Sequence, residues 1–176
     1  GDVYKRQASL EGANRWNKTY AEWTTGAASA SYSQASRYFT DYYQAIAKAS
    51  TFIQNVDKCQ EVGASVRGRW KEEARVLRAY YYFELLRIYG PVPLIGEDPI
   101  PLDASKEELI KVRNTVDECV EFIANELQKA IDSGDLPNRV SKNNLGRMDV
   151  GICKALKAKL YLYSVSYTHL TLPTNR

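Results

Sequence analysis

The sequence has few of the residues that most metal and catalytic sites require. Its 176 residues include one histidine, His169, and three cysteines, Cys59, Cys119 and Cys153. The cysteines share no metal-ligand spacing, which argues against a zinc site, and their odd number gives no disulfide framework. A Gly-rich phosphate loop and a serine nucleophile elbow are absent as well. We therefore predict no metal, no cofactor and no catalytic centre.

The chain also lacks a long hydrophobic run and a strong excess of one charge. It contains no stretch of 18 apolar residues and no signal region at its start, so we expect neither a membrane-spanning helix nor an export signal within it. The net charge is only +3, and the basic residues are interleaved with acids. This distribution argues against nucleic-acid binding. With 44% hydrophobic and 26% charged residues, the chain is typical of one globular domain, or part of one.

The two ends of the sequence do not continue the pattern of its interior. Residues 1–7 (GDVYKRQ) and 167–176 (YTHLTLPTNR) resemble translated sequencing-adaptor tails, and we predict that they are not native. The periodic pattern of the last helix ends near residue 164 and is followed by a Thr-rich segment that contains Pro173. We therefore expect residues 8–166 to be the native part of a protein that is longer at both ends.

Hydrophobic periodicity in the interior predicts four helices. They are expected at about residues 34–57, 67–89, 115–132 and 149–164. The second is apolar or aromatic around most of its circumference, so it needs neighbours on several sides. It should stop at Gly90, which is followed by Pro91. Asn114 or Thr115 is expected to cap the third helix, and Asp149 the fourth.

A narrow polar strip on the second helix contains Lys71, Arg75 and Arg78. Three like charges at helical spacing favour water or acidic partners from another element. We expect Arg75 and Arg78 to pair with carboxylates of a neighbouring helix, with Asp41 and Asp117 as the candidates.

An internal repeat relates the second helix to the fourth. The pattern Leu-Arg-Ala-x-x-Tyr at residues 77–82 recurs as Leu-Lys-Ala-x-x-Tyr at residues 156–161. The helices that precede these two share a similar spacing of apolar residues. We therefore predict an all-α fold of two tetratricopeptide-like helical hairpins, separated by a longer connection than tandem repeats use.

The second helix also carries a family resemblance. The run EARVLRAYYYFELLRIYGPVPLI, residues 73–95, resembles the signature helix of the SusD/RagB family of surface glycan-binding lipoproteins. The pair Gly146-Arg147 and the helix ALKAKLYLY resemble the second hairpin of that family. Phe39 and Ser50 stand where the family usually has Trp and Asn. Residues of about 35–164 thus resemble the N-terminal part of a SusD-like protein.

The resemblance implies a function in nutrient uptake. The protein would capture an oligosaccharide without hydrolysing it, together with a SusC-like TonB-dependent transporter. It would be a lipoprotein on the outer face of the cell outer membrane, with its signal and lipidated cysteine upstream of this sequence.

Sugar binding without catalysis needs flat aromatic faces beside hydrogen-bonding groups. The segment before the first helix offers Trp16, Trp23 and Tyr32, which we take as candidate ligand-binding residues. The alternative is that these rings pack against the hairpins. The tyrosines at 80–82 have helical spacing, which favours a place in the core.

Two other functions are alternatives to glycan binding. A helical-repeat scaffold would hold a peptide or partner helix in its groove. A glycan-degrading enzyme would need two facing carboxylates. The candidate acids are predicted on polar helix faces, without the buried pairing that this chemistry uses: Glu72, Glu73, Asp117, Glu118 and Glu121.

Overall fold

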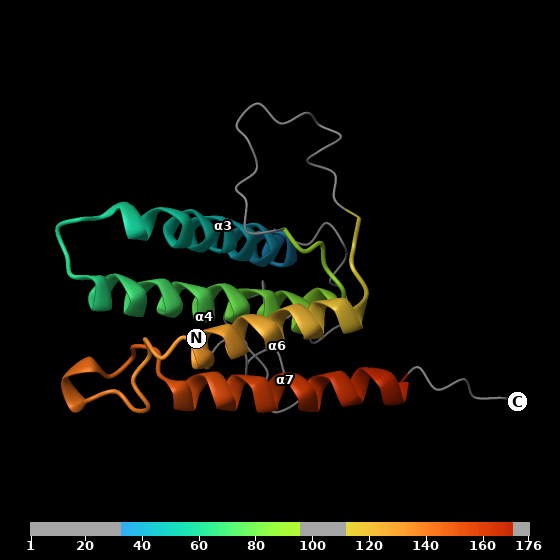
Figure 1. Ribbon diagram of the computed structural model, residues 1–176. Helices are drawn as coiled ribbons and strands as arrows, with labels where there is room; N and C mark the ends of the chain where they lie inside the picture. The colour runs from blue at the N-terminus through green and yellow to red at the C-terminus, as the bar shows by residue number, and fades with distance from the viewer. Residues whose placement is uncertain (1–32, 96–111, 171–176) are drawn as a thin grey trace, which may run out of the picture. The chain divides into compact units, whose positions relative to one another are not determined.

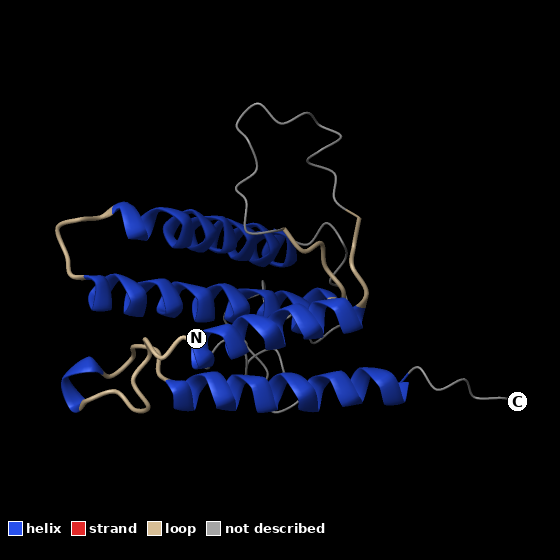
Figure 2. Ribbon diagram, viewed as in Figure 1, coloured by secondary structure: helices blue, strands red, loops and turns tan. Residues whose placement is uncertain are grey.

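The computed structural model describes residues 33–95 and 112–170, and all regular structure within these ranges is helical (Figures 1 and 2). The chain divides into two units, residues 1–41 and 42–176. The described part of the first unit is the start of one helix, where Arg37 and Asp41 form an exposed ion pair of 3.4 Å. None of the helices within the described ranges is long and apolar enough to cross a membrane.

The helices lie where the periodicity predicts them. They are α3 (Ser33–Asn55), α4 (Ala64–Tyr89), α6 (Val116–Asp132) and α7 (Val150–Leu170), with short 3₁₀ helices at Val56–Lys58 and Lys142–Asn144. Helix α4 stops at Gly90, whose φ of +69° lies in the left-handed region that glycine adopts readily. Helix α7 runs past the predicted end near residue 164, because the residues up to Leu170 include no glycine or proline to stop it.

Side-chain caps fix the starts of α6 and α7. Thr115 accepts a hydrogen bond from the Glu118 amide at 3.2 Å, and the Glu118 carboxylate accepts one from the Thr115 amide at 2.7 Å. These bonds hold the pKa of Glu118 below its usual value. Asp149 accepts from the Ile152 amide at 2.8 Å and from the Val140 amide at 3.1 Å. Both predicted caps are therefore confirmed.

Two tyrosines hold the extended segment that follows α4. The Tyr43 hydroxyl donates to the carbonyl of Pro93 at 2.7 Å, and the Tyr82 hydroxyl donates to the carbonyl of Ile95 at 3.0 Å. Val92, in the same segment, is buried. Residues 91–95 therefore lie against the first hairpin.

Helix α4 is the centre of the second unit. It packs closely on α6, and α6 packs on α7 (Figure 1). Small side chains such as Ala79 and Ala130, both fully buried, permit this close approach. Cys119 and Cys153 are also fully buried and have free thiols, as expected of small apolar fillers. Burial raises the pKa of the Cys153 thiol to about 11.

Tyr82 connects three helices. Its ring makes edge-on contacts with Tyr43 of α3, at 6.4 Å between centroids, and with Phe122 of α6, at 5.1 Å. The side chain is fully buried, and burial raises its pKa to about 12. Tyr80 and Tyr81 are only half-buried. Of the predicted tyrosine cluster, Tyr82 is thus the core residue.

The two halves of the internal repeat differ in exposure. Ala79 and Tyr82 are fully buried, whereas their counterparts Ala158 and Tyr161 are exposed, Tyr161 to 47%. Leu162 beside them is 72% exposed. Helix α6 covers this face of α4, and no helix of the described part covers the equivalent face of α7.

This difference predicts unequal effects of the same mutation at equivalent repeat positions. Tyr82→Ala should lower the free energy of unfolding by about 3–5 kcal/mol, because it removes a buried ring. Tyr161→Ala should change it by less than about 0.5 kcal/mol. Urea unfolding followed by circular dichroism measures both, and equal losses would contradict the arrangement of the helices.

Candidate functional site

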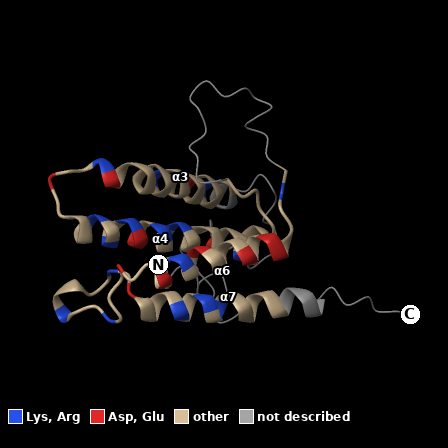
Figure 3. Cartoon of the chain, viewed as in Figure 1, with Lys and Arg blue, Asp and Glu red and all other residues tan. Residues whose placement is uncertain are grey.

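The aromatic residues predicted to bind sugar, Trp16, Trp23 and Tyr32, lie outside the described residues, so their role stays a prediction. In the described part, lysines or arginines lie on every α-helix, whereas acids lie on α3, α4 and α6 but not on α7 (Figure 3). The charged residues that pair across elements lie on α4, on α6, in the loop before α7 and, at Asp57, in the 3₁₀ helix after α3.

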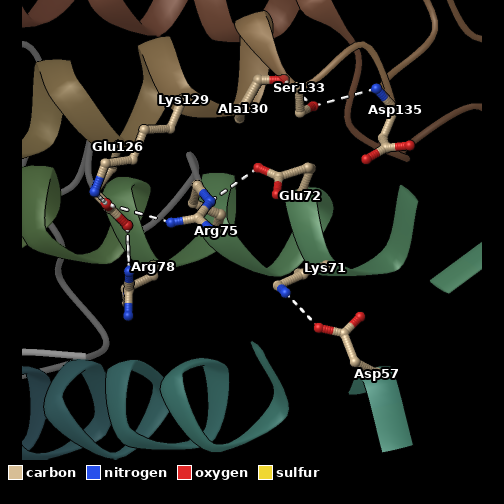
Figure 4. A network of polar contacts seen from close by, with 10 residues as sticks. All are labelled: Asp57, Lys71, Glu72, Arg75, Arg78, Glu126, Lys129, Ala130, Ser133 and Asp135. Carbon is tan, nitrogen blue, oxygen red and sulfur yellow. Dashed lines mark hydrogen bonds and ion pairs between the residues drawn. The ribbon is translucent and has the colours of Figure 1, made fainter. Parts of the chain in front are cut away.

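A buried ion-pair network joins α4 to α6 (Figure 4). The Glu126 carboxylate accepts from Arg78 Nε at 3.2 Å and from its Nη2 as well. It also pairs with Arg75 at 3.5 Å and with Lys129 at 3.2 Å. Arg78 Nη1 donates to the Ser50 hydroxyl of α3 at 3.1 Å. Arg78 and Glu126 are each only 1% exposed, so this network is part of the core.

The structural role predicted for the arginines is confirmed, but the predicted partners are wrong. Asp41 pairs with Arg37 on its own helix, and Asp117 is exposed in the first turn of α6. The carboxylate that Arg75 and Arg78 share is Glu126. The sequence carries a signal for it, because Glu126 follows the buried Ile123 by three residues and therefore lies on the same helix face.

Glu72 was also predicted on a polar face, and this is wrong. It is 6% exposed and accepts from Arg75 Nε at 2.9 Å. Burial raises the pKa of the Glu72 carboxyl, and the attraction of Arg75 opposes that rise. The other buried glutamates, Glu84 and Glu126, are ion-paired with arginines too. The carboxylates of Glu72, Glu84 and Glu126 are thus each ion-paired with an arginine.

Glu73 lies at the surface end of this region and binds two arginines. Arg147, from the loop before α7, donates to it through Nε at 2.9 Å and Nη2 at 2.7 Å. Arg69 donates from the same helix at 3.1 Å. The bidentate contact fixes the loop before α7 on α4. Local spacing in the sequence does not predict this pair, because residues 73 and 147 lie far apart in the chain.

Two open hollows flank Trp70 and Arg147. The α3–α4 hollow has a volume of about 500 Å³, and the α4–loop hollow about 440 Å³. Trp70 and Arg147 line both of them. The α3–α4 hollow adds Ala45, Lys48, Ala49, Phe52, Glu73, Ala74, Leu77 and Tyr81. The α4–loop hollow adds Ser65, Val66, Arg69, Gly134, Asp135, Leu136 and Pro137.

The two hollows offer groups that can bind a ligand. The hollows combine aromatic rings with charged hydrogen-bonding groups, and their volumes fall in the range of roughly 300–1,000 Å³ that ligand pockets have. Within residues 33–95 and 112–170, no cluster of three or more histidine, cysteine or acidic side chains could hold a metal ion.

The sequence and the fold both match known proteins. Residues 1–162 match a SusD-like family described as "Starch-binding associating with outer membrane". The chain belongs to the SusD-like family. A SusD-like protein of Bacteroides ovatus is 29% identical to it over 168 residues, which cover 92% of this chain and 29% of the relative.

Solved structures of SusD-like proteins have the same fold. A laminarin-binding SusD-like protein matches 84% of the chain with a TM-score of 0.72 and 28% identity. A structure with xylogluco-oligosaccharide matches 85% of the chain with a TM-score of 0.66 and 29% identity. The chain covers 30% and 27% of these two proteins, and thus spans less than a third of its SusD-like relatives.

The buried network predicts a large loss of stability when one partner is removed. Glu126→Ala should lower the free energy of unfolding by about 3–5 kcal/mol, because it leaves Arg78 buried without its carboxylate. The control is Asp57→Ala, which removes an exposed partner of Lys71 and should cost at most about 1 kcal/mol. Urea titration of both variants tests this, and a Glu126→Ala loss no larger than the control's would contradict it.

The raised pKa of Glu72 predicts a pH dependence of stability. The folded state holds the Glu72 proton more tightly than the unfolded chain does, so this group stabilises the fold most below its unfolded pKa of about 4.3. That contribution is lost as pH rises through the folded-state pKa.

Glu72→Gln should therefore gain stability relative to the wild type between pH 4 and pH 7. The measurement is the unfolding free energy at both values, with the exposed change Glu121→Gln as control. A difference between Glu72→Gln and wild type that stays constant with pH, or shrinks as pH rises, would disagree with this assignment.

Proposed function

We propose that the protein is a non-enzymatic glycan-binding component of an outer-membrane nutrient-uptake complex. The observation that carries this proposal is the family match over residues 1–162, together with relatives that bind laminarin or are solved with xylogluco-oligosaccharide. Because the chain covers less than a third of these relatives, we propose this activity for the whole protein.

The chemistry of the described residues supports binding without turnover. Glycoside hydrolysis uses two carboxyl groups that flank the sugar bond, one of them able to give up a proton. Glu72, Glu84 and Glu126 are instead each buried against an arginine. Their geometry serves the packing of helices and leaves no carboxylate of the three for a sugar.

The partner that we propose is a SusC-like TonB-dependent transporter, and the location is the outer face of the outer membrane. The family description, which names association with the outer membrane, supports this location. We propose attachment through a lipid anchor on a cysteine outside this sequence. The buried Cys119 and Cys153 are poor acceptors for a lipid, because each is fully enclosed by packed helices.

Titration calorimetry on the complete gene product tests the glycan-binding function. The ligands are laminarihexaose, xylogluco-oligosaccharide and a malto-oligosaccharide, and the protein should bind at least one of them. Chromatography of the sugar after long incubation should show no shorter product. Release of shorter sugars, or the absence of binding to all three, would contradict the proposal.

A further inference from the structure

The first hairpin carries a surface with the features of a sugar-binding site. We infer that Trp70 and Arg147 form the centre of an oligosaccharide-binding surface that extends over the α3–α4 hollow and the α4–loop hollow. This inference rests on the glycan-binding function proposed above and adds to it a place on the described residues.

Aromatic rings line this surface where a sugar could reach them. Trp70 is half-buried and lines both hollows, so part of its side chain borders each of them. Phe52 of α3 is 42% exposed, and Tyr81 of α4 is half-buried in the same hollow. Pyranose rings place their apolar C–H faces on such rings, while their hydroxyls need polar neighbours.

Those polar neighbours are held in place beside Trp70. The bidentate pair of Glu73 with Arg147 orients the guanidinium group of an arginine whose side chain is still 38% exposed. The Glu73 carboxylate, with two oxygens and about four lone-pair positions, can accept hydroxyl donors in addition to its arginine contacts. Each hydroxyl of a sugar can both donate and accept a hydrogen bond. The fixed carboxylate of Glu73 can accept from such hydroxyls, and the guanidinium of Arg147 can donate to them.

One polar atom in this region has an unused hydrogen-bonding position. Arg69 Nη2 is buried and has no hydrogen-bond partner among the described residues, while Arg69 Nε is bound to Glu73. Buried donors in proteins are nearly always satisfied. Arg69 lines the α4–loop hollow and its side chain is 26% exposed, so a shift of the guanidinium would bring Nη2 to a hydroxyl oxygen of a bound ligand.

The charges of the two hollows favour a ligand of little net charge. Lys48, Arg69 and Arg147 are balanced by Glu73 and Asp135, which leaves one excess cation. A strongly anionic ligand would meet two carboxylates, and an apolar helix would cover five charged groups. A hydroxyl-rich oligosaccharide suits both the rings and the balanced charges.

Tryptophan fluorescence can be used to follow the surroundings of Trp70. The chain has three tryptophans, at positions 16, 23 and 70, and two of them can be replaced. In the complete gene product with Trp16→Phe and Trp23→Phe, any other tryptophan of that product also being replaced by Phe, the emission comes from Trp70. Saturation with the sugar that binds best should shift this emission. The reciprocal Trp70→Phe protein, which retains Trp16 and Trp23, tests the N-terminal aromatic residues in the same titration.

Affinity measurements on alanine variants are the second test of this binding surface. By calorimetry on the complete gene product, Trp70→Ala and Arg147→Ala should each weaken binding at least tenfold, and Phe52→Ala at least threefold. Tyr161→Ala is the matched control, an exposed aromatic on α7 outside both hollows, and it should bind within twofold of wild type. Circular dichroism identifies any variant that does not fold.

The outcomes separate this inference from the proposed function. If the wild type binds sugar but the emission of Trp70 is unchanged and the variants bind within twofold of it, the inference is wrong and the glycan-binding function stands. An emission change confined to the Trp70→Phe protein would place the sugar at Trp16 or Trp23 and overturn the inference as well. If the wild type binds none of the sugars, the proposed function itself fails.

Discussion

The buried pair of Arg78 and Glu126 sets how the first hairpin meets the second. Two charges without water are tolerated only when they face each other and their remaining hydrogen-bonding groups are occupied. Arg78 meets this condition by binding Ser50 of α3 as well as Glu126 of α6. A slip of α6 along α4 would leave a buried charge without a partner, whereas a purely apolar interface would resist the slip far less. We interpret the pair as the device that fixes the register of the helices.

Features that depend on neighbouring residues could be predicted from the sequence. The four helices follow from apolar spacing, and the caps at Thr115 and Asp149 follow from short polar side chains that precede a periodic run. The end of α4 follows from Gly90, since a glycine before a proline is a local stop signal. The extension of α7 to Leu170 does not follow from the same signals. The change to a Thr-rich composition after residue 164 indicates a helix end there, but the helix continues.

Features that depend on distant residues could not be predicted in the same way. Glu126 lies 48 positions from Arg78 in the chain, and local spacing cannot choose among several acids. The apolar periodicity places Trp70 on α4 without distinguishing it from the other apolar residues, and Arg147 stands out only through the family resemblance. Their common place between two hollows depends on how the loop before α7 folds back to Glu73. The N-terminal candidates Trp16, Trp23 and Tyr32 lie outside the described residues.

The different exposure of the three cysteine thiols makes the rate at which the helices separate measurable. Cys119 lies in the first turn of α6 and Cys153 in the first turn of α7, both with no accessible surface, whereas Cys59 is partly accessible. An alkylating reagent would modify Cys59 at once, but would reach Cys119 and Cys153 only after α6 and α7 separate from the elements packed on them. The slow phase of such labelling would therefore measure how often the helices part, without any probe being added to the molecule.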